Sequence, residues 1–467
     1  MNAFGSKRLC SLQVSFLGAT RSVSGSMHLV ESGPHRLLLD CGLARGPRDE
    51  ARQRNRHFPF DPTHIDAVIL SHAHIDHCGN LPNLVRQGFP GPIYCTPASK
   101  DLIAVMLHDS ARIQEDEVHT TSDLGQGARP GGANRRPLYT SRDVNETIDR
   151  CVTIDYGVDI DINPEVRLRF TDAGHILGSA IVSLHLQHVG REQRLTFTGD
   201  LGRRGLPYLR EPSNVPPADL LICESTYGGK LHDSLESMAA RMGEIVRRVE
   251  LRGGKVFIPA FSLGRTQIVV HFLREWMAAG IVPRLPIYVD SPLAVEIAYV
   301  HEEHVEQLQK PDRDDIPVEY MLSQEEARIR GMQREPCIIV ASGGMCEGGR
   351  IISHLRHHLD DPRSAIVLVS YQAPYSLGAQ LMQKTPTVRF HGRTWNKWID
   401  VEQINGFSGH ADKVDFQALL GSAVGKTGQV RLVHGEAEAC EALAVQLREM
   451  GFGDVRAPEY EEVVSVA

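Results

Sequence analysis

The stretch AVILSHAHIDHCGNLP, residues 67–82, places three histidines and an aspartate directly after an apolar run. These polar residues are His72, His74, Asp76 and His77. The packing of a hydrophobic core gives no reason for such crowding. Neutral imidazoles and a carboxylate at a strand end are good zinc ligands, because His nitrogen and Asp oxygen both suit this borderline cation. The stretch therefore predicts a metal site.

Four residues are too few to surround two tetrahedral ions, so we expect more ligands at other strand ends. The candidates that follow apolar runs in the same way are Asp40 in LLLDCG, His175 in FTDAGHILGS, Asp200 in LTFTGDLG and His434 in VRLVHGEAE. Taken singly, each is typical of a turn or a cap. Their recurrence together with His-x-His-x-Asp-His favours a shared metal centre.

Composition limits the class of protein. A chain of 467 residues exceeds one ordinary core, so we expect two domains, one of which can be split by the other. Apolar residues make up 42% and charged residues 23%, as in soluble globular proteins. No apolar stretch is long enough to span a membrane and no signal peptide is recognisable, which predicts a cytoplasmic protein without a membrane partner.

Charge and cysteine content add two further limits. Nine cysteines without CxxC pairs indicate reduced thiols. The net charge of -8 argues against a generally basic nucleic-acid coat, so any polyanion must be bound locally.

The rhythm of apolar residues changes along the chain. Up to residue 228 short strands dominate, with helices expected near 80–88 and 99–118 and a glycine-rich loop over 122–137. Between 229 and 406 strands alternate with longer helices, as in parallel α/β units. This predicts a second domain, after which a helix, a strand and another helix follow.

Seven motifs together identify a family. They are Asp40 in LLLDCG, the SHAHIDH signature, His175 in DAGHILGSA, Asp200 in FTGD, Glu224 in CESTYG, His410 in GFSGHAD and His434 in LVHGE. Over nearly its whole length the chain resembles the β-CASP family of metallo-β-lactamase-fold nucleases, in its compact bacterial form. The resemblance implies an α/β fold, a metallo-β-lactamase αββα four-layer sandwich with an inserted α/β β-CASP domain. The implied limits are 1–228 and 407–467 for the sandwich and 229–406 for the insert.

The resemblance also implies the roles of the motif residues. It assigns His72, His74 and His175 to one Zn²⁺, Asp76, His77 and His434 to a second, and Asp200 to a bridge between them. A zinc-bound hydroxide would attack the phosphodiester, so that Asp76 and Asp200 serve catalysis as well as metal binding. His410 would act as general acid with help from Glu224, and Asp40 would position a ligand.

A histidine in the LVHGE motif resembles the RNA-processing branch of the family. We therefore predict a two-zinc ribonuclease of RNA processing or decay, acting as an endonuclease, a 5'-3' exonuclease or both. The alternatives are a β-CASP DNA nuclease and a non-catalytic scaffold subunit of an RNA-processing complex. A scaffold is disfavoured because all seven ligand positions are occupied, and a hydrolase of small esters is disfavoured by the large insert.

Two glycine- and arginine-containing turns are candidate RNA contacts. They contain Ser262 and Arg265 of FSLGR, and Gly343, Gly344 and Arg350 of ASGGMCEGGR. Backbone amides between a strand and a helix suit phosphate, but such glycines are equally typical of ordinary turns.

The chain departs from the family in two places. Gly409 stands where the family more often has Ala, and SYQAPYSLGAQ replaces GYQAxGTLGR, which bears on substrate preference. The assembly state stays open, with a homodimer as one option.

Overall fold

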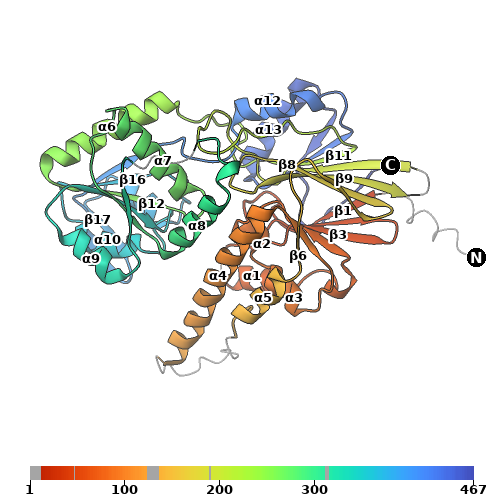
Figure 1. Ribbon diagram of the computed structural model, residues 1–467, viewed down its shortest axis with the longest axis horizontal. Coiled ribbons are helices and arrows are strands. Elements are labelled where there is room, and N and C mark those ends of the chain that lie inside the picture. Colours follow the sequence, from red (N-terminus) through yellow and green to blue (C-terminus); the bar gives the residue numbers. More distant parts are fainter. Residues whose placement is uncertain (1–11, 47, 124–135, 189–190, 311–314, 467) are drawn as a thin grey trace, which may run out of the picture. The chain divides into compact units, whose positions relative to one another are not determined.

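The computed structural model describes residues 12–46, 48–123, 136–188, 191–310 and 315–466 (Figure 1). Most of the predicted loop 122–137 lies outside these ranges. The chain separates into two compact units, the first formed by residues 1–231 and 410–467 and the second by residues 232–409. The first unit is therefore interrupted in sequence by the second.

The first unit contains two seven-stranded sheets. The first sheet has the order β22 (Val463–Val466), β1 (Leu12–Phe16), β2 (His28–Ser32), β3 (His35–Leu39), β4 (Ala67–Ile69), β5 (Ile93–Cys95), β6 (Cys151–Thr153). The second has the order β21 (Asp454–Arg456), β20 (Gln429–Val433), β11 (Leu220–Glu224), β10 (Arg191–Phe197), β9 (Ala180–His188), β8 (Val166–Asp172), β7 (Asp159–Asn163).

The two sheets share one hydrophobic core. In β1 and β8 buried and less buried residues alternate, so each strand turns one face inwards. Leu12, Val14 and Phe16 of β1 belong to the same buried cluster as Leu168 and Phe170 of β8. The sheets therefore pack face to face as a sandwich.

Helices cover the outer faces of the sandwich (Figure 1). On the side of the first sheet these are α1 (Arg48–Arg56), α2 (Ile75–Cys78), α3 (Leu81–Arg86), α4 (Pro97–Asp123) and α5 (Ser141–Ile148). On the side of the second sheet are α12 (Lys413–Leu420) and α13 (Ala437–Met450), whose apolar residues pack with β11 and β20. Short 3₁₀ turns occur at η1 (Pro62–His64) and η3 (Gly421–Ala423). The four-layer αββα sandwich predicted from sequence is confirmed.

The second unit is built on a parallel sheet of six strands, as the alternation of strands and helices predicted. Its order is β14 (Val318–Tyr320), β13 (Ile287–Asp290), β15 (Cys337–Ser342), β12 (Lys255–Ala260), β16 (Ala365–Leu368), β19 (Asp400–Gln403). Its helices are α6 (Leu235–Arg252), α7 (Arg265–Ala278), α8 (Pro292–Glu303), η2 (Val305–Gln307), α9 (Gln324–Met332), α10 (Ile351–His358) and α11 (Leu377–Met382). A separate hairpin joins β17 (Thr387–Phe390) to β18 (Arg393–Asn396).

Among the described helices, none combines the length and the apolar character that crossing a membrane requires.

Candidate metal centre

The predicted ligands come from one edge of the sandwich. In the first sheet, strands β3 and β4 are parallel. In the second sheet, β10, β11 and β20 are parallel to one another, and β8 runs in the same direction because both β8 and β10 are antiparallel to β9. Carboxyl ends of strands that run the same way meet at one edge of a sheet. The ligand positions are His72 and His74 after β4, Asp76 and His77 in α2, His175 after β8, Asp200 after β10, and His434 after β20.

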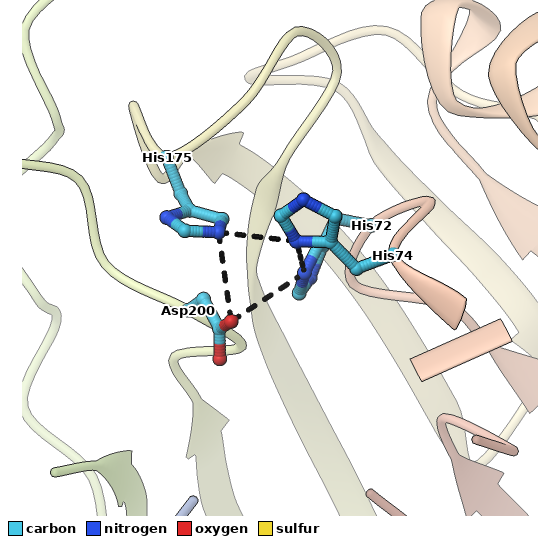
Figure 2. A group of neighbouring side chains, drawn as sticks. All are labelled: His72, His74, His175 and Asp200. Carbon is cyan, nitrogen blue, oxygen red and sulfur yellow. Dashed lines mark hydrogen bonds and ion pairs between the residues drawn. The ribbon is translucent and has the colours of Figure 1, made fainter. Parts of the chain in front are cut away.

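Three histidines form the first group of the centre. The Nδ1 atom of His74 lies 3.1 Å from Nε2 of His72 and 3.2 Å from Nε2 of His175. Figure 2 shows these rings and the Asp200 carboxylate pointing toward one another. Nitrogens bound tetrahedrally to one ion with bonds of about 2.0–2.1 Å would lie roughly 3.3 Å apart. The spacing thus fits a shared metal ion.

A second group lies on the other side of Asp200. Nε2 of His434 is 3.2 Å from Nε2 of His77 and 3.5 Å from Oδ2 of Asp76. These three side chains offer two nitrogens and one oxygen within ligand spacing. His434 has a left-handed backbone with φ 50°, a conformation that is uncommon outside glycine and is found at functional sites.

Asp200 contacts both groups through different oxygens. Its Oδ2 lies 3.5 Å from Nε2 of His72 and 3.6 Å from Nε2 of His175. Its Oδ1 lies 3.5 Å from Nε2 of His77 and 3.2 Å from Nδ1 of His434. Within the described residues Oδ1 is buried without a geometrically acceptable hydrogen bond. A buried carboxylate oxygen in that position is well suited to a cation.

The protonation states also suit metal binding. Burial lowers the pKa of His74 to about 4 and holds the pKa of His72 well below its usual value, so both imidazoles are neutral near pH 7. Burial also opposes protonation of His77, but the carboxylates of Asp200 and Asp40 raise its pKa well above the usual value. The carboxylates therefore favour positive charge at this point, which a bound cation would supply.

Asp40 and Ser71 fix the rings of two histidines. Nδ1–H of His77 donates to Oδ2 of Asp40 at 2.7 Å, which leaves Nε2 free for a metal. The Ser71 hydroxyl donates its hydrogen bond to the same Asp40 oxygen at 2.9 Å. Because a hydroxyl has one hydrogen, Ser71 must accept a hydrogen bond from Nδ1–H of His72, 3.0 Å away. Nε2 of His72 is thereby also left free. Such hydrogen bonds orient metal ligands and set their tautomers.

Thr226 makes the matching contact to His434. Its hydroxyl donates to the His434 carbonyl at 2.8 Å and therefore accepts from Nδ1–H of the same residue at 3.1 Å. The sequence analysis did not select Ser71 or Thr226. The only signal available was that Ser71 directly precedes His72 in SHAHIDH and that Thr226 lies two residues after Glu224 in CESTYG.

His410 and Glu224 form a hydrogen-bonded pair beside the metal ligands. Nδ1 of His410 lies 3.1 Å from Oε1 of Glu224 and 3.9 Å from Oδ2 of Asp200. Glu224 is fully buried and accepts from the backbone N–H groups of Leu201 and Thr226, each at 2.9 Å. The His410 side chain is 17% exposed, so solvent reaches its ring.

The predicted RNA contacts all lie in the second unit, where both arginines have internal partners. Arg265 donates to the carbonyl of Val369, and Nε of Arg350 lies 3.9 Å from the buried Asp290. Gly343 has φ 111° and a Cβ there would meet the carbonyl oxygen of Gly348 at 2.0 Å, so the turn itself requires glycine. The hydroxyl of Ser262 forms a hydrogen bond with the hydroxyl of Ser291 at 2.9 Å, and Gly344 packs against the ring of Phe261. These contacts favour the ordinary turn, and an RNA role for the five residues stays a prediction.

Three family models match successive parts of the chain. The metallo-beta-lactamase superfamily matches residues 21–240 and the Beta-Casp domain matches residues 266–381. A third model, described as the Zn-dependent metallo-hydrolase RNA specificity domain, matches residues 399–458.

A relative of similar length matches most of the chain. Ribonuclease TTHA0252 of Thermus thermophilus is 36% identical over 437 residues, which cover 91% of this chain and 94% of the relative. The chain belongs to the β-CASP family of metallo-β-lactamase-fold nucleases. This β-CASP protein is thus a metallo-hydrolase, and the family predicted from its motifs is confirmed.

More distant β-CASP relatives are longer. Transcription termination factor FttA of Pyrococcus horikoshii is 34% identical over 476 residues, covering 96% of this chain and 70% of the relative. FttA of Methanocaldococcus jannaschii is 33% identical over 460 residues, covering 94% and 69%. A solved structure of a protein of unknown function from Enterococcus faecalis shares the fold with a TM-score of 0.55 and 14% identity, over 98% of this chain and 100% of that one.

Proposed function

We propose that this protein is a two-zinc ribonuclease that hydrolyses RNA to leave 3'-hydroxyl and 5'-phosphate ends. The observation that supports two ions best is the position of Asp200. Its Oδ2 faces Nε2 of His72 in one group of ligand atoms and its Oδ1 faces Nε2 of His77 in the other, as in a bridging carboxylate. The donor set of histidine nitrogens and carboxylate oxygens suits zinc.

The two groups would divide the ions between them. His72, His74 and His175 would hold one zinc, Asp76, His77 and His434 the other, and Asp200 would lie between them. When bound, such a pair lowers the pKa of water and neutralises charge on a phosphate. Asp40, Ser71 and Thr226 would keep three of the imidazoles in the tautomer that leaves a nitrogen free.

His410 would donate the proton that the leaving 3'-oxygen needs. Because its Nδ1–H is held by Glu224, the proton available for transfer is on Nε2. Glu224 is fixed by two backbone N–H groups, so the imidazole is oriented before substrate arrives. The carboxylate also stabilises the protonated imidazole.

Three observations favour RNA as the substrate of the proposed activity. The model that matches residues 399–458 is described as an RNA specificity domain, and the relative from Thermus thermophilus is named a ribonuclease. A histidine at position 434 also resembles the RNA-processing branch. The alternatives that the test must separate are a DNA nuclease and a scaffold without activity.

The test compares matched RNA and DNA oligonucleotides of one sequence, each with a 5'-phosphate and with a 5'-hydroxyl. We expect the zinc-loaded protein to cut RNA and to lose this activity when a chelator removes the metal. Readdition of zinc should restore cleavage. Faster cleavage of DNA would refute the choice of substrate, and a metal-loaded protein that cuts neither would support the scaffold alternative.

Thr226→Val is expected to weaken zinc affinity by about 10- to 100-fold, because valine cannot accept the hydrogen bond that Nδ1–H of His434 donates to the threonine hydroxyl. Thr226→Ser keeps the hydroxyl and serves as the matched control. The measurement is competition for zinc with a chelator of known affinity, which does not depend on activity. Equal zinc affinity of the valine and serine variants would show that the hydroxyl does not position His434.

Three further predictions remain proposals. The domain limits 1–228, 229–406 and 407–467 lie close to the borders of the two compact units. A cytoplasmic location agrees with the eight described cysteines, all of which are free thiols. A homodimer is one option for the assembly.

A further inference from the structure

The β17–β18 hairpin of the second unit is a well-defined structural feature. Its strands pair in register from Thr387 opposite Asn396 to Phe390 opposite Arg393. The two turn residues, His391 and Gly392, both have positive φ, 47° and 73°, as a type I′ turn requires. This turn matches the twist of the strands and gives the hairpin a fixed shape.

The inner face of the hairpin anchors it to the second unit. Val388 and Phe390 are buried in a cluster that includes Ile351 and Leu355 of α10. Trp395 packs against this cluster, with its ring stacked on Phe390 at a centroid distance of 5.2 Å. The outer face is therefore presented on a rigid support.

The charge around the hairpin differs from that of the rest of the chain. Although the net charge is -8, residues 362–399 contain no Asp or Glu, and their basic residues are Arg363, Lys384, Arg389, Arg393 and Lys397. Two of these have internal roles. Arg363 pairs with Asp361, and the Lys397 ammonium group donates to backbone carbonyls of Leu381 and Gln383.

The other three cations have no such role. Lys384, Arg389 and Arg393 are exposed, and within the described ranges no carboxylate pairs with any of them. Surface cations without acidic partners produce a positive local potential that attracts polyanions. In an acidic protein this concentration of unpaired charge points to a partner.

The neighbouring side chains indicate what kind of polyanion fits. On the outer face Arg389 lies opposite Thr394 and Thr387 lies opposite Asn396, and these four side chains can donate hydrogen bonds to phosphate oxygens. Arg393 lies opposite the buried Phe390, on the other face of the hairpin, and is exposed where it follows the turn. The nearby Trp398 is 58% exposed and could stack on an unpaired base. Cations, short polar donors and an exposed indole together are typical of surfaces that bind single-stranded nucleic acid.

We propose that the hairpin, residues 387–396 with Lys384 and Trp398, binds the phosphate backbone of a single-stranded RNA. This inference rests on the proposed ribonuclease function and assigns a second RNA contact outside the metal centre. Arg389 on the outer face and Arg393 beside the turn carry the contact, so the RNA would cross the tip of the hairpin. Such a contact is governed by charge and does not depend on base sequence.

The test is the double variant Arg389→Ala/Arg393→Ala, combined with His410→Ala so that bound RNA is not cut. We measure the dissociation constant for a single-stranded RNA of about 20 nucleotides over a range of salt concentrations. Loss of two phosphate contacts should reduce the slope of log K against log salt by about 1.4 and weaken binding by about 10-fold at low salt. The double substitution to lysine should keep most of the affinity.

The matched control is Arg328→Ala/Arg330→Ala in the same unit. It removes the same charge, but these arginines already pair with Glu325 and Glu319, at 2.6 and 2.9 Å. Equal zinc content and circular dichroism establish that all variants are folded.

The outcomes separate the two proposals. If the hairpin variant and the control bind RNA with the same affinity and slope, the hairpin proposal is wrong. Binding of polyglutamate, as a model of an acidic protein, is measured in parallel. If the hairpin variant loses binding of polyglutamate but binds RNA as well as the parent, the hairpin proposal is also wrong and an acidic protein partner is favoured. A parent protein that neither binds nor cuts RNA would instead refute the ribonuclease function itself.

Discussion

Replacing His410 by alanine is expected to reduce the turnover of RNA cleavage by about 10²- to 10⁴-fold and to leave the zinc content unchanged. The physical reason is that the leaving 3'-oxygen is a poor leaving group unless it receives a proton. His410 lies 3.9 Å from Asp200 without belonging to either group of ligand atoms that we assign to zinc. We therefore expect the His410→Ala variant to keep its zinc while it loses most of its activity.

A sulfur-substituted substrate makes the role of the acid testable. When the bridging 3'-oxygen is replaced by sulfur, the leaving thiolate needs no proton because the pKa of a thiol is lower than that of an alcohol. The variant should then cut this substrate nearly as fast as the parent. An equal loss of rate on both substrates would show that His410 has another role.

Glu224→Gln provides the matched second variant. The carboxamide is the same size but lacks the charge that stabilises the imidazolium, so we expect a smaller loss of turnover than for His410→Ala. Because Glu224 is fully buried and accepts two backbone hydrogen bonds, thermal unfolding must also be compared. The double variant should be no slower than His410→Ala if the two residues act as one unit.

Asp200→Asn is expected to have the second large effect, a fall in zinc content from about two ions per chain to one or fewer and a loss of at least about 10³-fold in cleavage. The carboxamide keeps the shape but removes the negative charge that lies between the two groups of histidines. It also offers one oxygen acceptor in place of two. Elemental analysis of the purified variant and single-turnover cleavage measure the two losses.

Asp219→Asn is the control for this substitution. Asp219 precedes β11, at the opposite end of the sheet from the centre, and accepts a hydrogen bond from the Arg194 amide at 2.7 Å. We expect this variant to keep its zinc and its activity. An Asp200→Asn protein that binds two zinc ions and cuts RNA at the parental rate would rule out a bridging role.

The residues of the centre could be predicted because each carries its own local signal. His72, His74, Asp76 and His77 stand together after an apolar run, and His175, Asp200 and His434 follow strands of the same kind. Strand ends that run in one direction meet at one edge, so residue type and strand periodicity were enough to bring these side chains together. The same periodicity predicted the change of architecture in the middle of the chain, whereas the four layers were predicted from the resemblance to the β-CASP family.

The RNA contacts show where local signals fail. A glycine-rich turn between a strand and a helix looks the same whether it binds phosphate or only turns the chain. In the structure Gly343 is required by its φ of 111°, and Arg265 and Arg350 have internal partners. Neither fact can be read from the order of residues.

By itself, the sequence determined which side chains meet at the centre and in what fold they do so. Only the tertiary structure decided which nitrogen of His72, His77 and His434 is free, and that Ser71 and Thr226 hold two of these rings. It also decided that Asp200 presents one oxygen to each group. It also gathered the unpaired cations of the hairpin on one rigid support. The reason is that residue type and periodicity are local, whereas ring orientation depends on hydrogen bonds between residues as distant as 226 and 434, which only packing brings together.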